Sequence, residues 1–194
     1  MTFLIVGLVL FLGVHLVPTL PVIRERWQAS LGGGAYRGLF AAVSFLGLGL
    51  IIYGFSQRDY VPIWSPPDFM RHITFLLMLP VFILLAASQI PSRIRTWSKH
   101  PMLLAVKIWA FAHLLVNGDL AGILLFGGFL AYGVYDRISV KRRGALGPLE
   151  NRTGGLGGDV AAVAIGLAFY VFMLAWGHQH LIGIPLLRGV AIAS

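Results

Sequence analysis

One apolar segment of helix length, residues 99–119, carries most of the side chains in this chain that could do chemistry. It holds two imidazoles and an ammonium group, those of His100, His113 and Lys107, and it ends in Asn117-Gly118-Asp119. At 100° per residue His100 and Lys107 fall within about 20° of each other, whereas His113 lies more than about 100° from Lys107. A helix with polar groups on two faces cannot turn both toward lipid. We therefore expect this segment in the centre of a helix bundle and take it as the candidate functional helix.

Two histidines lie well inside apolar stretches, His15 in the first stretch and His113 in the central one. Such a histidine is costly unless it forms a hydrogen bond to a neighbouring helix or ligates a cofactor. The chain has no cysteine, so any metal or haem ligand must be His, Met, Tyr, Lys or a carboxylate. Neutral imidazole is the usual axial ligand of haem in such a bundle. Taken singly, each histidine is compatible with a hydrogen bond to a neighbouring helix. Taken together, the two histidines favour a haem site.

The remaining histidines have simpler explanations. His72 lies in the first turn of an apolar stretch and could merely reach the membrane interface, and His100 precedes a proline at a helix start, where capping explains it. His178 and His180 follow the last apolar stretch, and we expect no ligand role for them. Lys107 lies in mid-helix, where we expect it to meet an anion or a carbonyl.

The composition places the whole chain in a membrane. Of its 194 residues 58% are hydrophobic and 11% charged, and the mean hydropathy is +0.83. At roughly 20 residues per span there is room for about six helices and none for a soluble domain. We therefore predict an all-α polytopic helix bundle that forms one transmembrane domain over residues 1–194. The predicted spans are 2–22, 38–55, 69–89, 101–116, 119–135 and 159–176.

Several local signals shape these spans. Asp68 is a plausible N-cap of the third span, and Pro80 is expected to kink it. Asn117-Gly118 predicts a turn tight enough to lay the fifth span antiparallel beside the fourth. Gly47 and Gly49 suit the close approach of a neighbouring helix to the second span.

The loop charges predict the orientation. The first, third and fifth loops, all expected to be irregular, carry three, three and five Lys or Arg residues, the second one and the fourth none. Because cytoplasmic loops hold the excess of Lys and Arg, both termini should face away from the cytoplasm. The formal charge of +8 then reflects topology and contact with anionic membrane lipid, and nucleic acid is not expected as a partner. We expect a multi-pass membrane protein.

A set of short motifs resembles the NnrU-like membrane proteins and, through them, the zeta-carotene isomerase of plants and cyanobacteria. The resemblance covers roughly residues 1–143. It rests on the first span ending near His15, Arg71-His72, His100-Pro101, Trp109-Ala-Phe-Ala-His113, Asn117-Gly118-Asp119, Asp136-Arg137 and Lys141-Arg142-Arg143.

The resemblance implies a haem b cofactor, because the isomerase is understood to rearrange a carotenoid double bond through haem iron. It matches His113 to the histidine of the central motif of that enzyme and His15 to its first-helix histidine. Ala110 stands where the isomerase has a cysteine, so a switch of iron ligand from His to Cys is excluded here. Further candidates for contact with the cofactor are Lys107, His72, Arg71, Asn117 and His100.

The predicted site is a haem between the first and fourth spans with His15 and His113 as axial ligands. From the span limits, His15 lies about 5 Å to the cytoplasmic side of mid-membrane and His113 about 5 Å to the other side. Ligation of one iron by both histidines requires the two imidazoles to lie at nearly the same depth in the membrane. If His15 and His113 do not, His72 is the substitute for His15.

The family resemblance implies a multi-pass protein of the bacterial inner (cytoplasmic) membrane. It also implies an accessory role in denitrification and nitric oxide metabolism, with nitric-oxide-related membrane proteins as partners. Redox or ligand sensing would follow from how the axial sites are filled. One alternative is a haem-dependent isomerase of a carotenoid or other polyene lipid. Another is a haem-free membrane assembly factor in which the histidines only bridge helices. The sequence names neither a substrate nor an oligomeric state.

Overall fold

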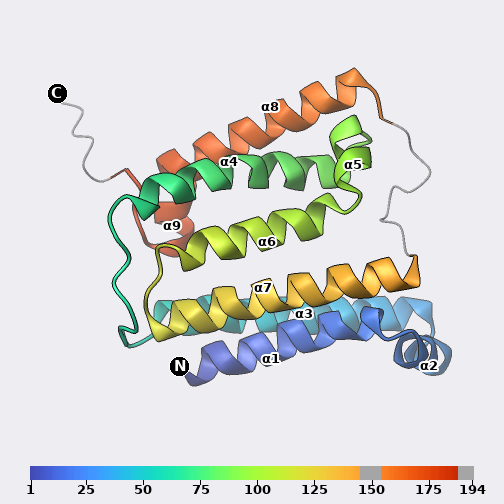
Figure 1. Cartoon of the computed structure of the whole chain (residues 1–194). Coiled ribbons are helices and arrows are strands. Elements are labelled where there is room, and N and C mark those ends of the chain that lie inside the picture. Colours follow the sequence, from blue (N-terminus) through green and yellow to red (C-terminus); the bar gives the residue numbers. More distant parts are fainter. Residues whose placement is uncertain (145–153, 188–194) are drawn as a thin grey trace. The chain divides into compact units, whose positions relative to one another are not determined.

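A computed structural model describes residues 1–144 and 154–187, and within them the regular structure is helical. Two isolated bridges, Pro62 with Asp119 and Ser92 with Gly155, are the β-type pairing in this part of the chain. The helices, drawn in Figure 1, are α1 (Thr2–Leu16), the 3₁₀ turn η1 (Val17–Thr19), α2 (Pro21–Leu31), α3 (Gly33–Ser56), α4 (Met70–Gln89), α5 (Arg93–Ser98), α6 (Pro101–Leu114), α7 (Leu120–Arg143), α8 (Leu156–Phe172), the π-helical turn η2 (Met173–Gly177) and α9 (His178–Ile182).

Five helical stretches are long and apolar enough to cross a membrane, so the all-α polytopic prediction is confirmed. They are Thr2–Thr19, Gly33–Ser56, Met70–Gln89, Leu120–Arg143 and Leu156–Ile182. The predicted fourth span, α6, has only 14 residues. At 1.5 Å per residue that is roughly 21 Å, shorter than the roughly 30 Å hydrocarbon layer.

The basic segments differ most from the sequence prediction, which treated them as loops. The first contains the 11-residue helix α2, and the third contains α5. α7 continues past the predicted end at Tyr135 to Arg143, where three cations in its last turn are favoured by the helix dipole. Of the predicted fifth loop, residues 145–153 lie outside the described residues. α8, η2 and α9 together extend past Trp176 to Ile182.

The predicted cap of the third span is wrong. α4 begins at Met70 with Phe69 at the N-cap, and no side chain caps it, so Asp68 lies outside the helix. Pro80 lies inside α4, which continues through it to Gln89.

The described residues divide into two compact units. Unit 1 comprises residues 1–68 and 113–144, and unit 2 comprises residues 69–112 and 154–187. The division falls inside α6, between Ala112 and His113, so His15 and His113 belong to unit 1 and the other candidate residues of α4 and α6 belong to unit 2.

Glycines hold unit 1 together by letting backbones meet. A Cβ on Gly7 would lie 2.6 Å from the backbone nitrogen of Ile51, and one on Gly54 would overlap the backbone of Leu4, so α1 packs antiparallel on α3. Gly47 takes part, with a Cβ position 2.8 Å from the nitrogen of Phe11, whereas Gly49 has nothing within 4 Å. The sequence expectation is therefore confirmed for Gly47 and wrong for Gly49.

The loop after α3 is bonded to the turn before α7, and we call this contact of Ile63 and Trp64 with Gly118 the clamp. The amides of Ile63 and Trp64 donate to the carbonyl of Gly118, at 2.8 and 3.1 Å, and a Cβ on Gly118 would overlap the carbonyl of Trp64. Asp119 caps α7 through the amide of Gly122 (3.3 Å) and pairs with Arg58, whose Nε lies 3.1 Å from Oδ2. This clamp holds the turn that leads from α6 to α7.

Unit 2 is built on α4. Gly166 of α8 lies against the backbone of Ile83, and the cluster of Val81, Leu84 and Ala105 joins α4 to α6. The Thr74 hydroxyl donates to the carbonyl of Ala112 over 2.9 Å, which satisfies a polar group inside the apolar contact.

Candidate functional site

His15 has a fixed imidazole orientation in the last turn of α1. Its Nδ1 lies 2.6 Å from the carbonyl oxygen of Phe11, and because a carbonyl can only accept, Nδ1 carries the proton. The lone pair of the neutral ring is then on Nε2. Backbone carbonyls commonly orient metal-ligating histidines in this way.

Aromatic rings surround this imidazole. It stacks on Phe11 with centroids 4.3 Å apart and 27° between the planes, and Phe40 of α3 lies 5.0 Å away. Tyr132 of α7 presents its edge at 6.1 Å and 83°. Three helices of unit 1 therefore set the position of a half-buried ring.

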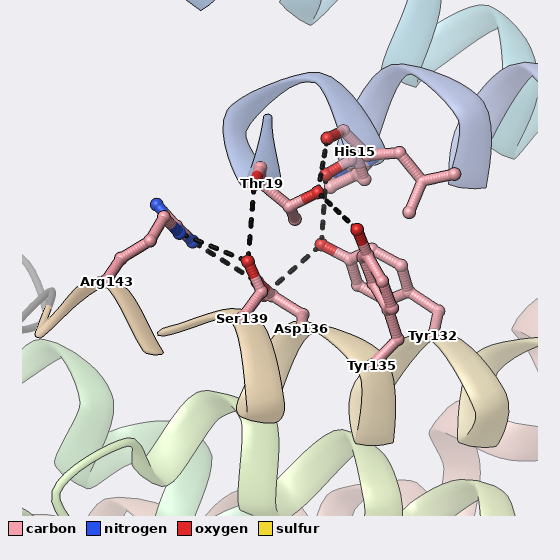
Figure 2. A network of polar contacts seen from close by, with 8 residues as sticks. His15, Thr19, Tyr132, Tyr135, Asp136, Ser139 and Arg143 are labelled. Atoms are coloured by element: carbon pink, nitrogen blue, oxygen red, sulfur yellow. Dashed lines mark hydrogen bonds and ion pairs between the residues drawn. The ribbon is translucent and has the colours of Figure 1, made fainter. Parts of the chain in front are cut away.

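A polar network extends from His15 along α7 (Figure 2). The Tyr132 hydroxyl lies 3.3 Å from the carbonyl oxygen of His15 and 3.4 Å from Oδ2 of Asp136, and its single proton can serve only one of these acceptors fully. The Asp136 carboxylate lies 3.7 Å from Arg143. Ser139 donates to the carbonyl of Thr19 over 3.3 Å and accepts from Nε of Arg143 over 3.1 Å. The network fixes the end of α1 against the last turns of α7.

Sequence reasoning missed this network, although a signal for it exists. Tyr132, Asp136, Ser139 and Arg143 recur at spacings of three and four residues, which places them on one face of a helix. Because residues 136–143 were interpreted as a loop, their common face was not seen.

His113 lies at the end of α6 with partners of a different kind. Its ring stacks on Phe126 of α7, with centroids 4.7 Å apart and 26° between the planes. Its carbonyl accepts hydrogen bonds from the backbone amide of Asn117 (2.9 Å) and from the amide side chain of that residue (2.8 Å). Asn117 therefore closes the turn after α6.

The two predicted ligands belong to one unit but face α7 at different levels. His15 contacts Tyr132 and His113 contacts Phe126. These positions are six residues apart, which is roughly 9 Å along the helix axis and about 120° around it. The offset agrees in size with the one that the span limits suggest.

The other candidates belong to unit 2. Lys107 is half-buried on α6 and has no hydrogen bond or ion pair within the described ranges 1–144 and 154–187. His72 is exposed in the first turn of α4. Its neighbour Arg71 donates to the carbonyl of Leu186 and lies 5.3 Å above the Phe75 ring. The His100 carbonyl accepts from the amide of Leu104 over 3.1 Å, which starts α6.

The two histidines of α9 repeat the hydrogen bond of His15. His178 donates Nδ1 to the carbonyl of Ile184 over 2.7 Å, and His180 donates Nδ1 to that of Trp176 over 2.8 Å. His180 also stacks on the Trp176 ring, at 4.2 Å and 15°. His180 is exposed and His178 is half-buried. In the part of the chain that the structure describes, no group of three or more His, Cys, Asp or Glu residues could hold a metal ion.

Comparison with known proteins gives one result. A family model described as NnrU protein matches residues 3–186, which is nearly the whole chain. No curated protein and no solved structure matches.

Proposed function

Because the chain belongs to the NnrU family, we propose that it is a haem b-binding protein of the bacterial inner membrane. Its role is an accessory or redox- and ligand-sensing one in denitrification and nitric oxide metabolism. The multi-pass helical architecture supports the membrane part of this proposal. The haem part rests on the chemistry of two imidazoles in unit 1.

The observation that carries the proposal is the setting of the His15 imidazole among aromatic rings, together with its hydrogen bond. Nδ1 donates to the carbonyl of Phe11, so Nε2 is the nitrogen with a lone pair, and the ring is held between Phe11 and Phe40. Apolar and aromatic surroundings suit a porphyrin, and neutral imidazole suits its iron. The donor set therefore fits haem.

His15 and His113 would hold the haem iron, and Lys107, which has no ion pair with another described residue, would pair with a propionate. Because the two imidazoles contact α7 at levels roughly 9 Å apart, a single iron could hold both only if one of the helices shifts. His72 remains the substitute second ligand. When bound, the haem would supply a redox couple and a site for small diatomic ligands.

A second candidate function comes from the family relation to zeta-carotene isomerase. It needs the same haem and an apolar polyene substrate, and Ala110 removes the cysteine that the isomerase has at this place. A third candidate is a haem-free assembly factor in which the histidines only bridge helices. The ring contacts of His15 with Phe40 and of His113 with Phe126 support this candidate.

The decisive experiment is an absorption spectrum of the protein purified from cells supplied with a haem precursor. We expect a Soret band that sharpens on reduction, together with pyridine haemochrome bands of haem b. A protein that carries no Soret band under these conditions would contradict both haem functions and favour the assembly factor. With haem present, conversion of a supplied cis-polyene would favour the isomerase, and binding of nitric oxide without such conversion would favour the sensor.

A further inference from the structure

α2 (Pro21–Leu31) runs across the end of unit 1. In Figure 1 it is seen nearly along its axis, whereas α1, α3 and α7 are seen from the side. None of its residues is buried. It is joined to α1 through η1 and to α3 at Gly32, whose φ of 80° suits glycine and lets the chain turn sharply into the next span. Since one membrane span ends at Thr19 and the next begins at Gly33, α2 has to lie near the membrane surface.

One side of α2 is an apolar stripe. Ile23, Trp27 and Leu31 recur every four residues and cover about 80° of the helix circumference. They are 39%, 39% and 46% exposed, so each packs partly on its own unit and leaves a large apolar area uncovered. Trp27 also borders a small space beside Tyr36 and Phe40 of α3. An apolar stripe of this kind is favourable against acyl chains and costly in water.

The charged side chains of α2 are distributed around this stripe. From its centre Arg24 lies about 60° to one side and Arg26 about 100° to the other, while Glu25 is about 160° away, on the opposite face. All three are exposed. None of them forms an ion pair with another described residue. Arginines that flank an apolar stripe can bury their stems and hold the guanidinium groups at the level of lipid headgroups.

We propose that α2 is an interfacial helix that binds the phosphate groups of anionic phospholipids through Arg24 and Arg26, with Ile23, Trp27 and Leu31 immersed among the acyl chains. Charge complementarity supports this occupant, because the two guanidinium groups are exposed and form no ion pair with a described residue, while the only carboxylate of α2 lies on the face opposite the stripe. The placement between two consecutive spans supports it further, because lipid is the partner that this level of the protein always meets. The proposal is independent of haem.

The first test measures the depth of α2. The chain has no cysteine, so single cysteines carrying nitroxide labels can be placed by Ile23→Cys and Glu25→Cys in protein reconstituted into vesicles of phosphatidylcholine and phosphatidylglycerol. We expect the label at 23 to be relaxed more by oxygen and the label at 25 more by a water-soluble nickel chelate. Equal access of the chelate to both positions would overturn the interfacial placement. Spin–spin coupling between the labels of two protein copies would overturn it as well, because it would show that a second copy covers α2 in place of lipid.

The second test measures lipid preference by native mass spectrometry of the purified protein titrated with phosphatidylglycerol or phosphatidylcholine. At roughly fivefold per cation, Arg24→Gln with Arg26→Gln should lower the preference for phosphatidylglycerol by about 20- to 30-fold. Lys141→Gln with Arg142→Gln removes the same charge from the end of α7 and is the matched control. Arg24→Lys with Arg26→Lys keeps the charge and should retain most of the preference.

Inorganic phosphate added in excess should not displace the bound lipid, because the acyl chains contribute through the apolar stripe. An equal loss in the α7 control would overturn the assignment to α2, since it would mean that total charge alone decides the preference. Displacement of the lipid by inorganic phosphate would show that α2 binds free phosphate and not a lipid headgroup, and would overturn the proposal. Circular dichroism of each variant confirms that the helix content is unchanged.

Discussion

At the residue scale, the three histidines His15, His178 and His180 form the same hydrogen bond in different surroundings. Each donates Nδ1 to a backbone carbonyl, so each keeps its lone pair on Nε2. His180 is exposed and His178 is half-buried, whereas the half-buried ring of His15 packs among aromatic rings from α1, α3 and α7. Burial among aromatic rings, more than the tautomer, makes His15 the better candidate ligand.

Single substitutions of the histidines separate the possible ligand sets. His15→Ala should leave no haem or a five-coordinate iron with a shifted Soret band. His180→Ala is the matched control, because it removes the same kind of imidazole from an exposed position, and its spectrum should equal that of the wild type. If His15 merely stabilises α1, its variant keeps the wild-type spectrum and loses only about 1 to 2 kcal/mol of stability.

His113→Ala and His72→Ala identify the second ligand. Similar spectral damage from His15→Ala and His113→Ala would support bis-histidine ligation and require the two levels on α7 to converge in the haem-bound protein. Damage from His113→Ala and His72→Ala, with His15→Ala silent, would move the second ligand to α4. Absorption and electron paramagnetic resonance spectra of the three variants decide between these outcomes.

Lys107 is the other residue whose surroundings invite a test. A half-buried cation in α6 without a described partner is costly unless an anion joins it. Lys107→Met should therefore lower the amount of haem retained through purification, while membrane insertion stays normal. Lys99→Met, an exposed site before α6, serves as control. Equal haem content in both variants would assign Lys107 a purely structural role.

At the element scale, the packing of α1 on α3 depends on the absence of side chains. Gly54→Ala places a Cβ in the backbone of Leu4, and overpacking of this kind costs roughly 1 to 3 kcal/mol. Gly49→Ala lies in the same helix with nothing within 4 Å and should leave stability unchanged or slightly raised, because alanine favours helix. Thermal unfolding in detergent compares the two, and equal midpoints would contradict the close helix contact.

The pair of Arg58 and Asp119 combines a helix cap with an ion pair. Asp119→Asn keeps an acceptor for the Gly122 amide, so it should cost about 1 kcal/mol less than Asp119→Ala. In a double-mutant cycle with Arg58→Met, the coupling energy should fall between roughly 0.5 and 3 kcal/mol. Chemical denaturation in mixed micelles measures these values. Additive effects would show that the ion pair contributes nothing beyond the cap.

Apolar length was enough to predict most of the spanning helices from sequence, because lipid leaves a backbone few alternatives to helix. The same criterion missed α2 and α5, whose arginines and short length resemble those of loops. It also ended α7 too early, at Tyr135, since residues 136–143 are polar. Helices at a membrane surface need an analysis of which residues share a face, which hydropathy alone does not provide.

The candidate site was predictable only in part. The positions of His15 and His113 inside spans mark them in the sequence, and the structure assigns both to unit 1. The Phe40 ring and the Tyr132 ring could not be assigned to His15, because they come from other helices, α3 and α7. Contacts of this kind depend on helix rotation, which a single sequence leaves open.

At the scale of the whole molecule, the order of the helices and the distribution of basic residues together predict on which side of the membrane each connecting segment lies. Basic residues gather around α2, α5 and the end of α7, while the loop between α3 and α4 holds Arg58 as its single Lys or Arg, paired with Asp119. An odd number of spans separates these two groups of segments if α6 counts as a span. Whether the 14 residues of α6 cross the membrane therefore decides whether α5 and the end of α7 lie on one side.

Cysteine labelling tests this orientation without disturbing the helices, since the natural chain has no cysteine. Single cysteines at Ser30 in α2, Thr96 in α5 and Gln57 after α3 all replace exposed residues. With a membrane-impermeant maleimide on intact spheroplasts, we expect labelling at 57 only, and labelling at 30 and 96 after the membrane is opened, because basic segments stay in the cytoplasm. To test α6, a fourth cysteine at Lys141, in the last turn of α7, should behave like the one at 30. If it is labelled in intact spheroplasts while 96 is protected, α6 does not cross the membrane, and the chain has five spans.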